Sequence, residues 1–171
     1  MIDPFGRLPR VRSDIEARHL DLGMLTETFS FGDISGYIDG DIQGLEMSGT
    51  RPLAFAARIQ SSPGEYRKRI SQRAVQNISS LGGAGAGAAI QRSFLRFFET
   101  FGYERLGLSC RLVNEICLME GIAAAPQGYV IVKGGGIPAL NVIGYNRYVH
   151  WDELVSRLQA VIAGNSKIEI R

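Results

Sequence analysis

The chain contains few of the residues from which most catalytic sites are built. Its 171 residues include two histidines, His19 and His150, two cysteines and one tryptophan. A nucleophile with its base, or a pair of working carboxylates, needs a supporting motif, and neither histidine stands in one. Two histidines and two cysteines without C-x-x-C spacing also provide no metal-ligand pattern. The sequence therefore predicts a protein that is not an enzyme and uses neither a metal ion nor a cofactor.

A strong net charge is also missing. Nineteen Lys and Arg residues against seventeen Asp and Glu residues leave a formal net charge of +2. A phosphate backbone is normally met by a much stronger basic field, concentrated on one surface. We therefore expect no nucleic-acid partner.

Long apolar runs are absent. No stretch reaches the roughly 18 apolar residues that a membrane-spanning helix needs. The first fifteen residues include Asp3, Pro4, Pro9 and Asp14 and lack the apolar block of a secretory signal. We expect neither a transmembrane segment nor a signal peptide in this chain.

The composition is that of a folded protein, with 45% hydrophobic, 9% aromatic and 21% charged residues. A chain of this length is long enough to bury one core. We therefore predict a single domain over residues 1–171, with a β-rich part (1–62), a helical part (63–101) and a part with strands and a helix (102–171).

Residues 1–62 show the period-two alternation of strands. Apolar and polar side chains alternate over 11–17, 34–46 and 53–60, and Asp21 is placed to cap a short helical turn. The middle segment carries Gly36, Gly40 and Gly44 on its apolar side. Because glycine in a strand marks bends and bulges, these segments predict a curved antiparallel meander.

Residues 63–101 predict a pair of amphipathic helices, 66–79 and 88–101, joined by the flexible glycine-rich stretch 83–87. That stretch follows a predicted helix and lacks a Gly-Lys-Ser or Gly-Lys-Thr sequence, so a hinge is favoured over a phosphate loop. The second helix would align four aromatic side chains on one stripe: Phe94, Phe97, Phe98 and Phe101. The stripe either packs in the core or contacts lipid acyl chains.

Strands return after residue 102. We expect them at 105–112, 115–120, 129–133 and 141–145, followed by a helix over 151–163 that ends at Gly164-Asn165. The fold class predicted from these patterns is α+β. It consists of a curved, mainly antiparallel sheet with the helix pair inserted and a helix near the C-terminus.

Cys110 and Cys117 flank a predicted hairpin turn. If Val113-Asn114 forms the turn, the two cysteines lie directly opposite each other and can form a disulfide bond. If Asn114-Glu115 forms the turn, Cys110 faces Met119, and we expect the sulfur atoms to miss each other. The sequence leaves both registers open.

Several stretches resemble a known family. Residues 28–36 (TFSFGDISG), 70–80 (ISQRAVQNISS), 95–99 (LRFFE), 107–112 (GLSCRL), 132–136 (VKGGG) and 141–145 (NVIGY) are similar to C-terminal regions of bacterial AsmA-like envelope proteins of the YdbH and TamB types. The resemblance covers roughly residues 11–158. It implies that the chain is the C-terminal part of a longer β-groove protein in the periplasm or cell envelope.

The same resemblance implies a function. A non-enzymatic module of this kind would take part in phospholipid transport between the inner and outer membranes, with acyl chains bound in an apolar groove that includes Phe94, Phe97, Phe98 and Phe101. Its partners would be phospholipid or a membrane surface, and a protein on the outer-membrane side. The alternative is a structural module that docks an envelope partner by strand addition. A continuous apolar groove favours the first function, and a closed core with an exposed edge strand favours the second.

Overall fold

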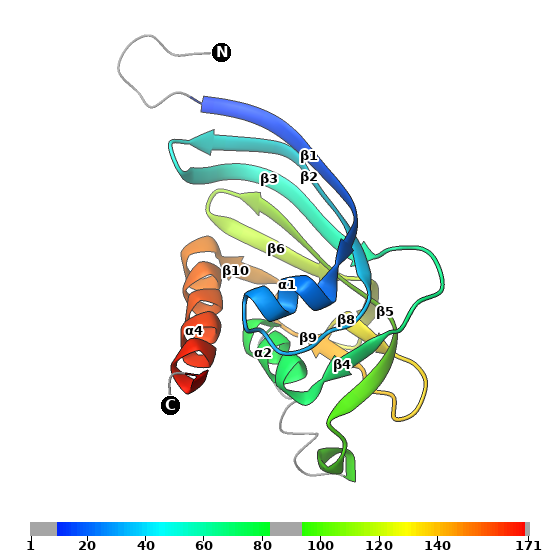
Figure 1. Ribbon diagram of the computed structural model, residues 1–171. Helices are drawn as coiled ribbons and strands as arrows, with labels where there is room; N and C mark the ends of the chain where they lie inside the picture. Colours follow the sequence, from blue (N-terminus) through cyan, green and yellow to red (C-terminus); the bar gives the residue numbers. More distant parts are fainter. Residues whose placement is uncertain (1–9, 83–93, 170–171) are drawn as a thin grey trace.

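One large antiparallel sheet organises the part of the chain that the computed structural model describes, residues 10–82 and 94–169 (Figure 1). Within these residues ten strands join in the sheet. They are β1 (Arg10–Asp21), β2 (Tyr37–Ser48), β3 (Arg51–Ser61), β4 (Arg69–Ser71), β5 (Thr100–Val113), β6 (Ile116–Gly121), β7 (Ala123–Ala125), β8 (Gly128–Gly134), β9 (Val142–Gly144) and β10 (Tyr148–His150). The helices are α1 (Leu22–Thr28), α2 (Gln72–Gly82) and α4 (Trp151–Glu169), with a 3-10 turn η1 (Phe94–Phe97).

Strand β5 connects two parts of the sheet. The main path runs β1-β2-β3-β5-β6-β10, and every pair along it is antiparallel. The first half of β5 also pairs with β4 and β8, and β8 in turn pairs with β7 and β9. The predicted α+β class and the antiparallel β1-β2-β3 meander are therefore confirmed.

The sheet is bent, as the glycine pattern predicted, and Figure 1 shows β1, β2 and β3 curving over the helices. The register between β2 and β3 shifts between Gln43 and Glu46, and the β1–β2 register shifts twice. Gly44 lies inside the first of these irregularities with φ +60°, a conformation that costs glycine little and other residues more.

The core lies where β5, β6, β8 and β9 meet α1 and α2. Its largest fully buried side chains include Tyr129, Phe101, Ile70 and Leu112. Helix α1 begins at the predicted cap, because the Asp21 carboxylate accepts a hydrogen bond from the Met24 amide at 3.3 Å.

The inserted helix pair differs from the prediction. Residues 66–71 do not form the first turns of a helix, since Arg69–Ser71 pairs with Thr100–Gly102 and helix α2 starts at Gln72. The Ser71 hydroxyl accepts a hydrogen bond from the Ala74 amide at 3.1 Å and so caps the helix.

The helix predicted over 88–101 is wrong at its C-terminal end. Residues 83–93 lie outside the described part of the chain, residues 94–97 form only the 3-10 turn η1, and β5 starts at Thr100. Pairing with β4 satisfies the backbone of residues 100–102, and this tertiary contact decides the local structure.

Helix α4 starts at Trp151 as expected but continues through Gly164 and Asn165 to Glu169. The predicted stop is therefore wrong. A glycine inside a helix costs only about 1 kcal/mol relative to alanine, which is too little to end a helix by itself.

Candidate functional site: an amphipathic sheet with an open edge

The inner face of the main sheet, which faces the helices, carries a continuous row of apolar side chains. Residues that pair across antiparallel strands point to the same face. Following the register from β1 to β6 gives one row in which each residue is the partner of the next: Ile15, Ile42, Ala57, Cys110 and Met119. The row crosses five strands without a polar side chain.

The opposite, outer face is polar at the neighbouring position of each strand. Its row runs through Glu16, Asp41, Arg58, Ser109 and Glu120 in the same register. Because side chains alternate between the two faces of a strand, this pair of rows makes the sheet amphipathic from β1 to β6. The inner face is built for apolar contacts.

The inner face is covered at β6 and more exposed at β1. Met119 on β6 is 4% exposed, whereas Ile59 on β3 is 41% and Ile15 on β1 is 48% exposed. Val11, near the start of β1, is 59% exposed. One end of the apolar face is thus covered and the other end is open.

Strand β1 is also an unpaired edge within the described residues, since its only strand partner there is β2. Its twelve residues are almost all exposed. An edge of this length presents a row of backbone N–H and C=O groups to which another strand can add.

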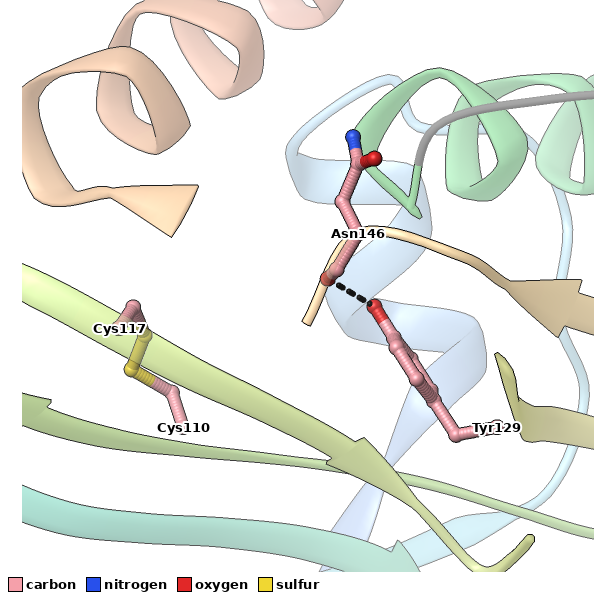
Figure 2. The surroundings of a disulfide bond; sticks show 4 residues. All are labelled: Cys110, Cys117, Tyr129 and Asn146. Atoms are coloured by element: carbon pink, nitrogen blue, oxygen red, sulfur yellow. Dashed lines mark hydrogen bonds between the residues drawn. A yellow bond between two sulfur atoms is a disulfide. The ribbon is translucent and has the colours of Figure 1, made fainter. Parts of the chain in front are cut away.

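Helix α4 and a disulfide bond cover the other end of the inner face. Trp151, the first residue of α4, packs edge-on against Phe55 of β3 with ring centroids 5.5 Å apart. Beside them, Cys110 and Cys117 join β5 to β6 (Figure 2). Cys117 is fully buried, so the bond belongs to the closed part of the sheet.

The disulfide corrects our sequence interpretation. The turn is Asn114-Glu115, both with positive φ, and Cys110 pairs with Met119, which is the register in which we expected the sulfurs to miss. The cysteines are instead diagonal neighbours on one face, with Cα atoms 5.4 Å apart. The diagonal distance of a twisted hairpin falls within the range that a disulfide spans.

The structure does not bring the four predicted phenylalanines onto one stripe. Phe101 is fully buried in β5, opposite Ile70. Phe97 is 74% exposed and Phe98 39% exposed at the end of η1, and the side chain of Phe94 lies outside the described residues. The four phenylalanines have the sequence spacing of a helical stripe, but the chain forms a turn followed by a strand there. Phe97, Phe98 and Phe101 are not part of the apolar row on the inner face.

A serine, a histidine and an aspartate meet where β1, β2 and β3 bend, but they do not form a catalytic relay. The Asp39 carboxylate accepts hydrogen bonds from the Ser62 hydroxyl at 2.7 Å and from the backbone amide of His19 at 2.9 Å. These two bonds, the serine bond first, lower the pKa of Asp39. The His19 ring stacks on Tyr37 with centroids 3.9 Å apart. The Ser62 hydroxyl thus donates its proton to the Asp39 carboxylate and not to the His19 ring, which is why the three residues form no relay. The cluster instead holds the bend of β1, β2 and β3.

Two clefts of the described surface include charged side chains in their linings. One of about 490 Å³ lies on the outer face and includes Asp41, Arg58 and Arg111. A second of about 350 Å³ lies beside Ser62, Lys68 and Arg105. Over residues 10–82 and 94–169, no three potential metal ligands come together. None of the helices in that part of the chain has the length and apolar character to cross a membrane.

Comparisons with known proteins add no assignment, because no family model, curated protein or solved structure matches the chain.

Sequence reasoning missed the inner-face residues Ile15 and Ile59 as a candidate site, although their alternation was recognised. The missing information was the register, which shows that they face the same side as Met119. Ile137, which is 90% exposed on the loop after β8, was also missed. A single apolar residue in a glycine-rich loop carries no periodic signal.

Proposed function

We propose that this chain is a non-enzymatic module of a cell-envelope protein that takes part in phospholipid transport, and that the inner face of its sheet contacts acyl chains. The observation that carries this proposal is the apolar row from β1 to β6, whose exposure rises from 4% at Met119 to 48% at Ile15. At β6 the apolar surface is covered, and toward β1 it stays open as far as the edge of the sheet.

Acyl chains fit such a surface because their transfer from water is favourable by about 0.8 kcal/mol for each CH2 group that is buried. Binding of this kind needs no nucleophile or base. In the row from β1 to β3 the inner face supplies the side chains of Ile15, Ile42 and Ala57, and the neighbouring outer positions carry Glu16, Asp41 and Arg58.

The cell-envelope location is part of the same proposal. The resemblance to AsmA-like proteins supports it, and so does the Cys110–Cys117 disulfide, because such bonds persist in oxidising compartments such as the periplasm.

The test is native mass spectrometry of the chain purified from an envelope extract, followed by organic extraction and lipid identification. We expect co-purified phospholipid in the wild-type protein and its loss in Ile59→Asp, which places a charge on the exposed part of the inner face. Ala56→Asp is the matched control on the same strand, because Ala56 pairs with Gln43 and Arg111 on the outer face. A folded wild-type chain that never carries lipid, or equal lipid loss in both variants, would refute the proposal.

A second function, docking of an envelope partner by strand addition, is favoured by the unpaired edge of β1. It is compatible with lipid binding, since an added strand would extend the open end of the apolar face.

Glu16 and Ala17 provide the test because adjacent N–H groups point to opposite sides of a strand. One of the two substitutions, Glu16→Pro or Ala17→Pro, therefore removes an N–H group that points away from β2, and the other removes an N–H group that points toward β2. We expect the first of these variants to keep its fold and lose the hydrogen-exchange protection that a partner strand gives to β1. Equal exchange of β1 in the isolated chain and in the envelope-bound protein would argue against docking.

A further inference from the structure

Three large apolar side chains project from one end of the molecule, away from the inner face. Phe97 is 74%, Phe98 is 39% and Ile137 is 90% exposed. We refer to these three residues as the apolar tip. In Figure 1 the η1 turn lies at the bottom of the molecule, at the opposite end from the β2–β3 hairpin.

Hydrogen bonds hold the η1 part of the tip in place. The side-chain amide of Gln72, at the start of α2, donates to the backbone carbonyl oxygens of Leu95, Arg96 and Phe98 at 3.3, 3.0 and 2.5 Å. The Gln72 backbone amide also donates to the Glu99 carbonyl at 3.0 Å. One residue of α2 thus fixes the backbone that presents Phe97 and Phe98.

Arg69 ties the Ile137 loop to the same place. Its guanidinium donates to the Thr100 hydroxyl at 2.8 Å and to the Ile137 carbonyl at 3.3 Å. The Gly102 amide donates to the Pro138 carbonyl at 2.8 Å. Two segments that are far apart in sequence are therefore bonded side by side, and each places an apolar side chain in solvent.

Cations flank the tip. The Arg96 guanidinium lies 4.6 Å from the centroid of the Phe97 ring, and the Arg69 guanidinium is bonded to Thr100 and to the Ile137 carbonyl. Arg73 follows Gln72 in the first turn of α2, and one acidic residue, Glu99, follows Phe98. Exposed apolar side chains with adjacent basic residues are complementary to the surface of an anionic bilayer, where the rings enter the interface and the cations meet phosphates.

We propose that the apolar tip inserts into the surface of an anionic phospholipid membrane. A protein partner fits less well, because a stable protein interface buries about 800 Å² on each side. An aromatic side chain contributes only about 150–250 Å², so three side chains fall short of such an interface. The membrane contact deepens the lipid function proposed above and rests on it for its purpose, but it uses different residues.

The experiment is co-sedimentation of the full chain with vesicles of phosphatidylcholine, with and without phosphatidylglycerol. We expect binding to the mixed vesicles and a decrease of about tenfold or more in the double variant Phe97→Ser/Ile137→Ser. Arg96→Gln should reduce binding about fivefold on the anionic vesicles only. The matched control is Met24→Ser/Tyr148→Ser, which removes two side chains that are 67% and 76% exposed elsewhere on the surface. We expect it to bind like the wild type.

Two outcomes would overturn the proposal: a wild-type chain that stays in the supernatant with both vesicle types, or a tip variant that sediments as well as the wild type. Ile59→Asp separates this proposal from the acyl-chain function. It should lose co-purified lipid and still sediment with anionic vesicles, whereas the tip double variant should show the reverse. Circular dichroism spectra that match the wild type establish that each variant is folded.

Discussion

Tyr103 places a polar hydroxyl in the core of the fold. It is 3% exposed, and its hydroxyl donates to the Ser35 carbonyl at 2.6 Å, which links β5 to the segment before β2. Burial raises the pKa of Tyr103, so the phenol stays neutral and remains a hydrogen-bond donor. Its contribution is a neutral hydrogen bond in the core.

We predict that Tyr103→Phe lowers the free energy of unfolding by about 1–2 kcal/mol, because the Ser35 carbonyl loses its donor while the ring still fills its site. Urea denaturation measures the change. Tyr148→Phe is the control, since Tyr148 is 76% exposed and its substitution should change stability by less than about 0.5 kcal/mol. Equal midpoints for wild type and Tyr103→Phe would contradict the role given to the hydroxyl.

The β5–β6 hairpin is the element in which the disulfide acts. Cys110 and Cys117 are seven residues apart and join the two strands near the Asn114-Glu115 turn. In the chain-entropy model, a disulfide that closes a loop of this length in the unfolded chain stabilises the folded state by about 2 kcal/mol. We therefore predict that reduction lowers the urea midpoint of the wild-type chain correspondingly.

Cys110→Ser provides the control for that prediction, because it lacks the bond and should unfold at the same urea concentration with and without reductant. Thiol titration establishes that the wild-type bond has been reduced. A urea midpoint that does not move after complete reduction would show that the backbone pairing of β5 with β6 holds the hairpin without the disulfide.

Element prediction succeeded where the local pattern and the tertiary structure agree. The alternation of β1, β2 and β3, the Asp21 cap and the start of α4 could all be predicted from the sequence. Residues 94–101 could not, since phenylalanines spaced three and four apart fit a helix, while Thr100 and Phe101 also suit a strand. Pairing with β4 selects the strand, and only the folded chain contains that information.

At the scale of the whole molecule, the candidate site depends on register rather than on any motif. The sequence predicted an apolar lipid contact at the phenylalanines, whereas the extended apolar surface lies on the inner sheet face. Ile15 and Met119 are more than a hundred residues apart, and the five-strand register is what places them in one row. Bulges such as the one at Gly44 shift that register, so it does not follow from alternation alone.

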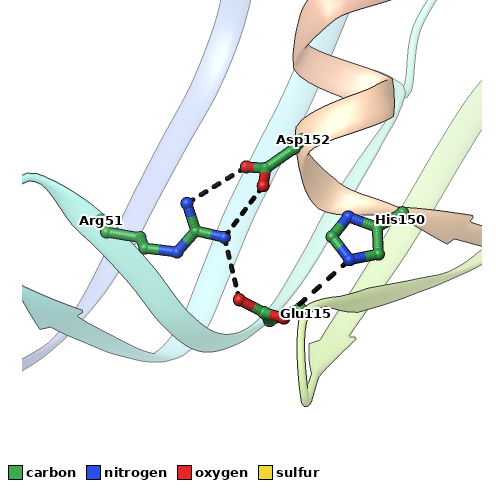
Figure 3. A network of polar contacts seen from close by, with 4 residues as sticks. All are labelled: Arg51, Glu115, His150 and Asp152. Atoms are coloured by element: carbon green, nitrogen blue, oxygen red, sulfur yellow. Dashed lines mark hydrogen bonds and ion pairs between the residues drawn. The ribbon is translucent and has the colours of Figure 1, made fainter.

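A charged network joins three parts of the molecule that the chain brings together from a distance (Figure 3). Arg51, the first residue of β3, donates to both Asp152 oxygens at 3.1 and 3.3 Å and to Glu115 at 3.1 Å. His150 lies 3.9 Å from Glu115. The β2–β3 hairpin, the β5–β6 turn and the start of α4 thus share one guanidinium, and the hydrogen bond from Arg51 lowers the pKa of Asp152.

The sign of the pH dependence follows from that lowered pKa. A carboxyl whose pKa is lower in the folded state stabilises the fold above its unfolded pKa and loses this effect as pH falls through the folded value. The ordinary pKa of Asp152 is 3.8, so we expect the loss below about pH 4. The network is solvent-exposed, and its effect should also shrink as salt concentration rises.

We predict that Arg51→Gln unfolds at lower urea concentration than the wild type at about pH 7 and that the difference disappears at about pH 2. Urea titrations across this range measure the difference. Asp39 keeps its lowered pKa in the variant through Ser62 and His19, so both chains should still lose stability in acid. A difference that stayed constant from neutral to acid pH would show that Arg51 acts through packing rather than charge, and the three elements would then be joined by contact area instead of by the ion network.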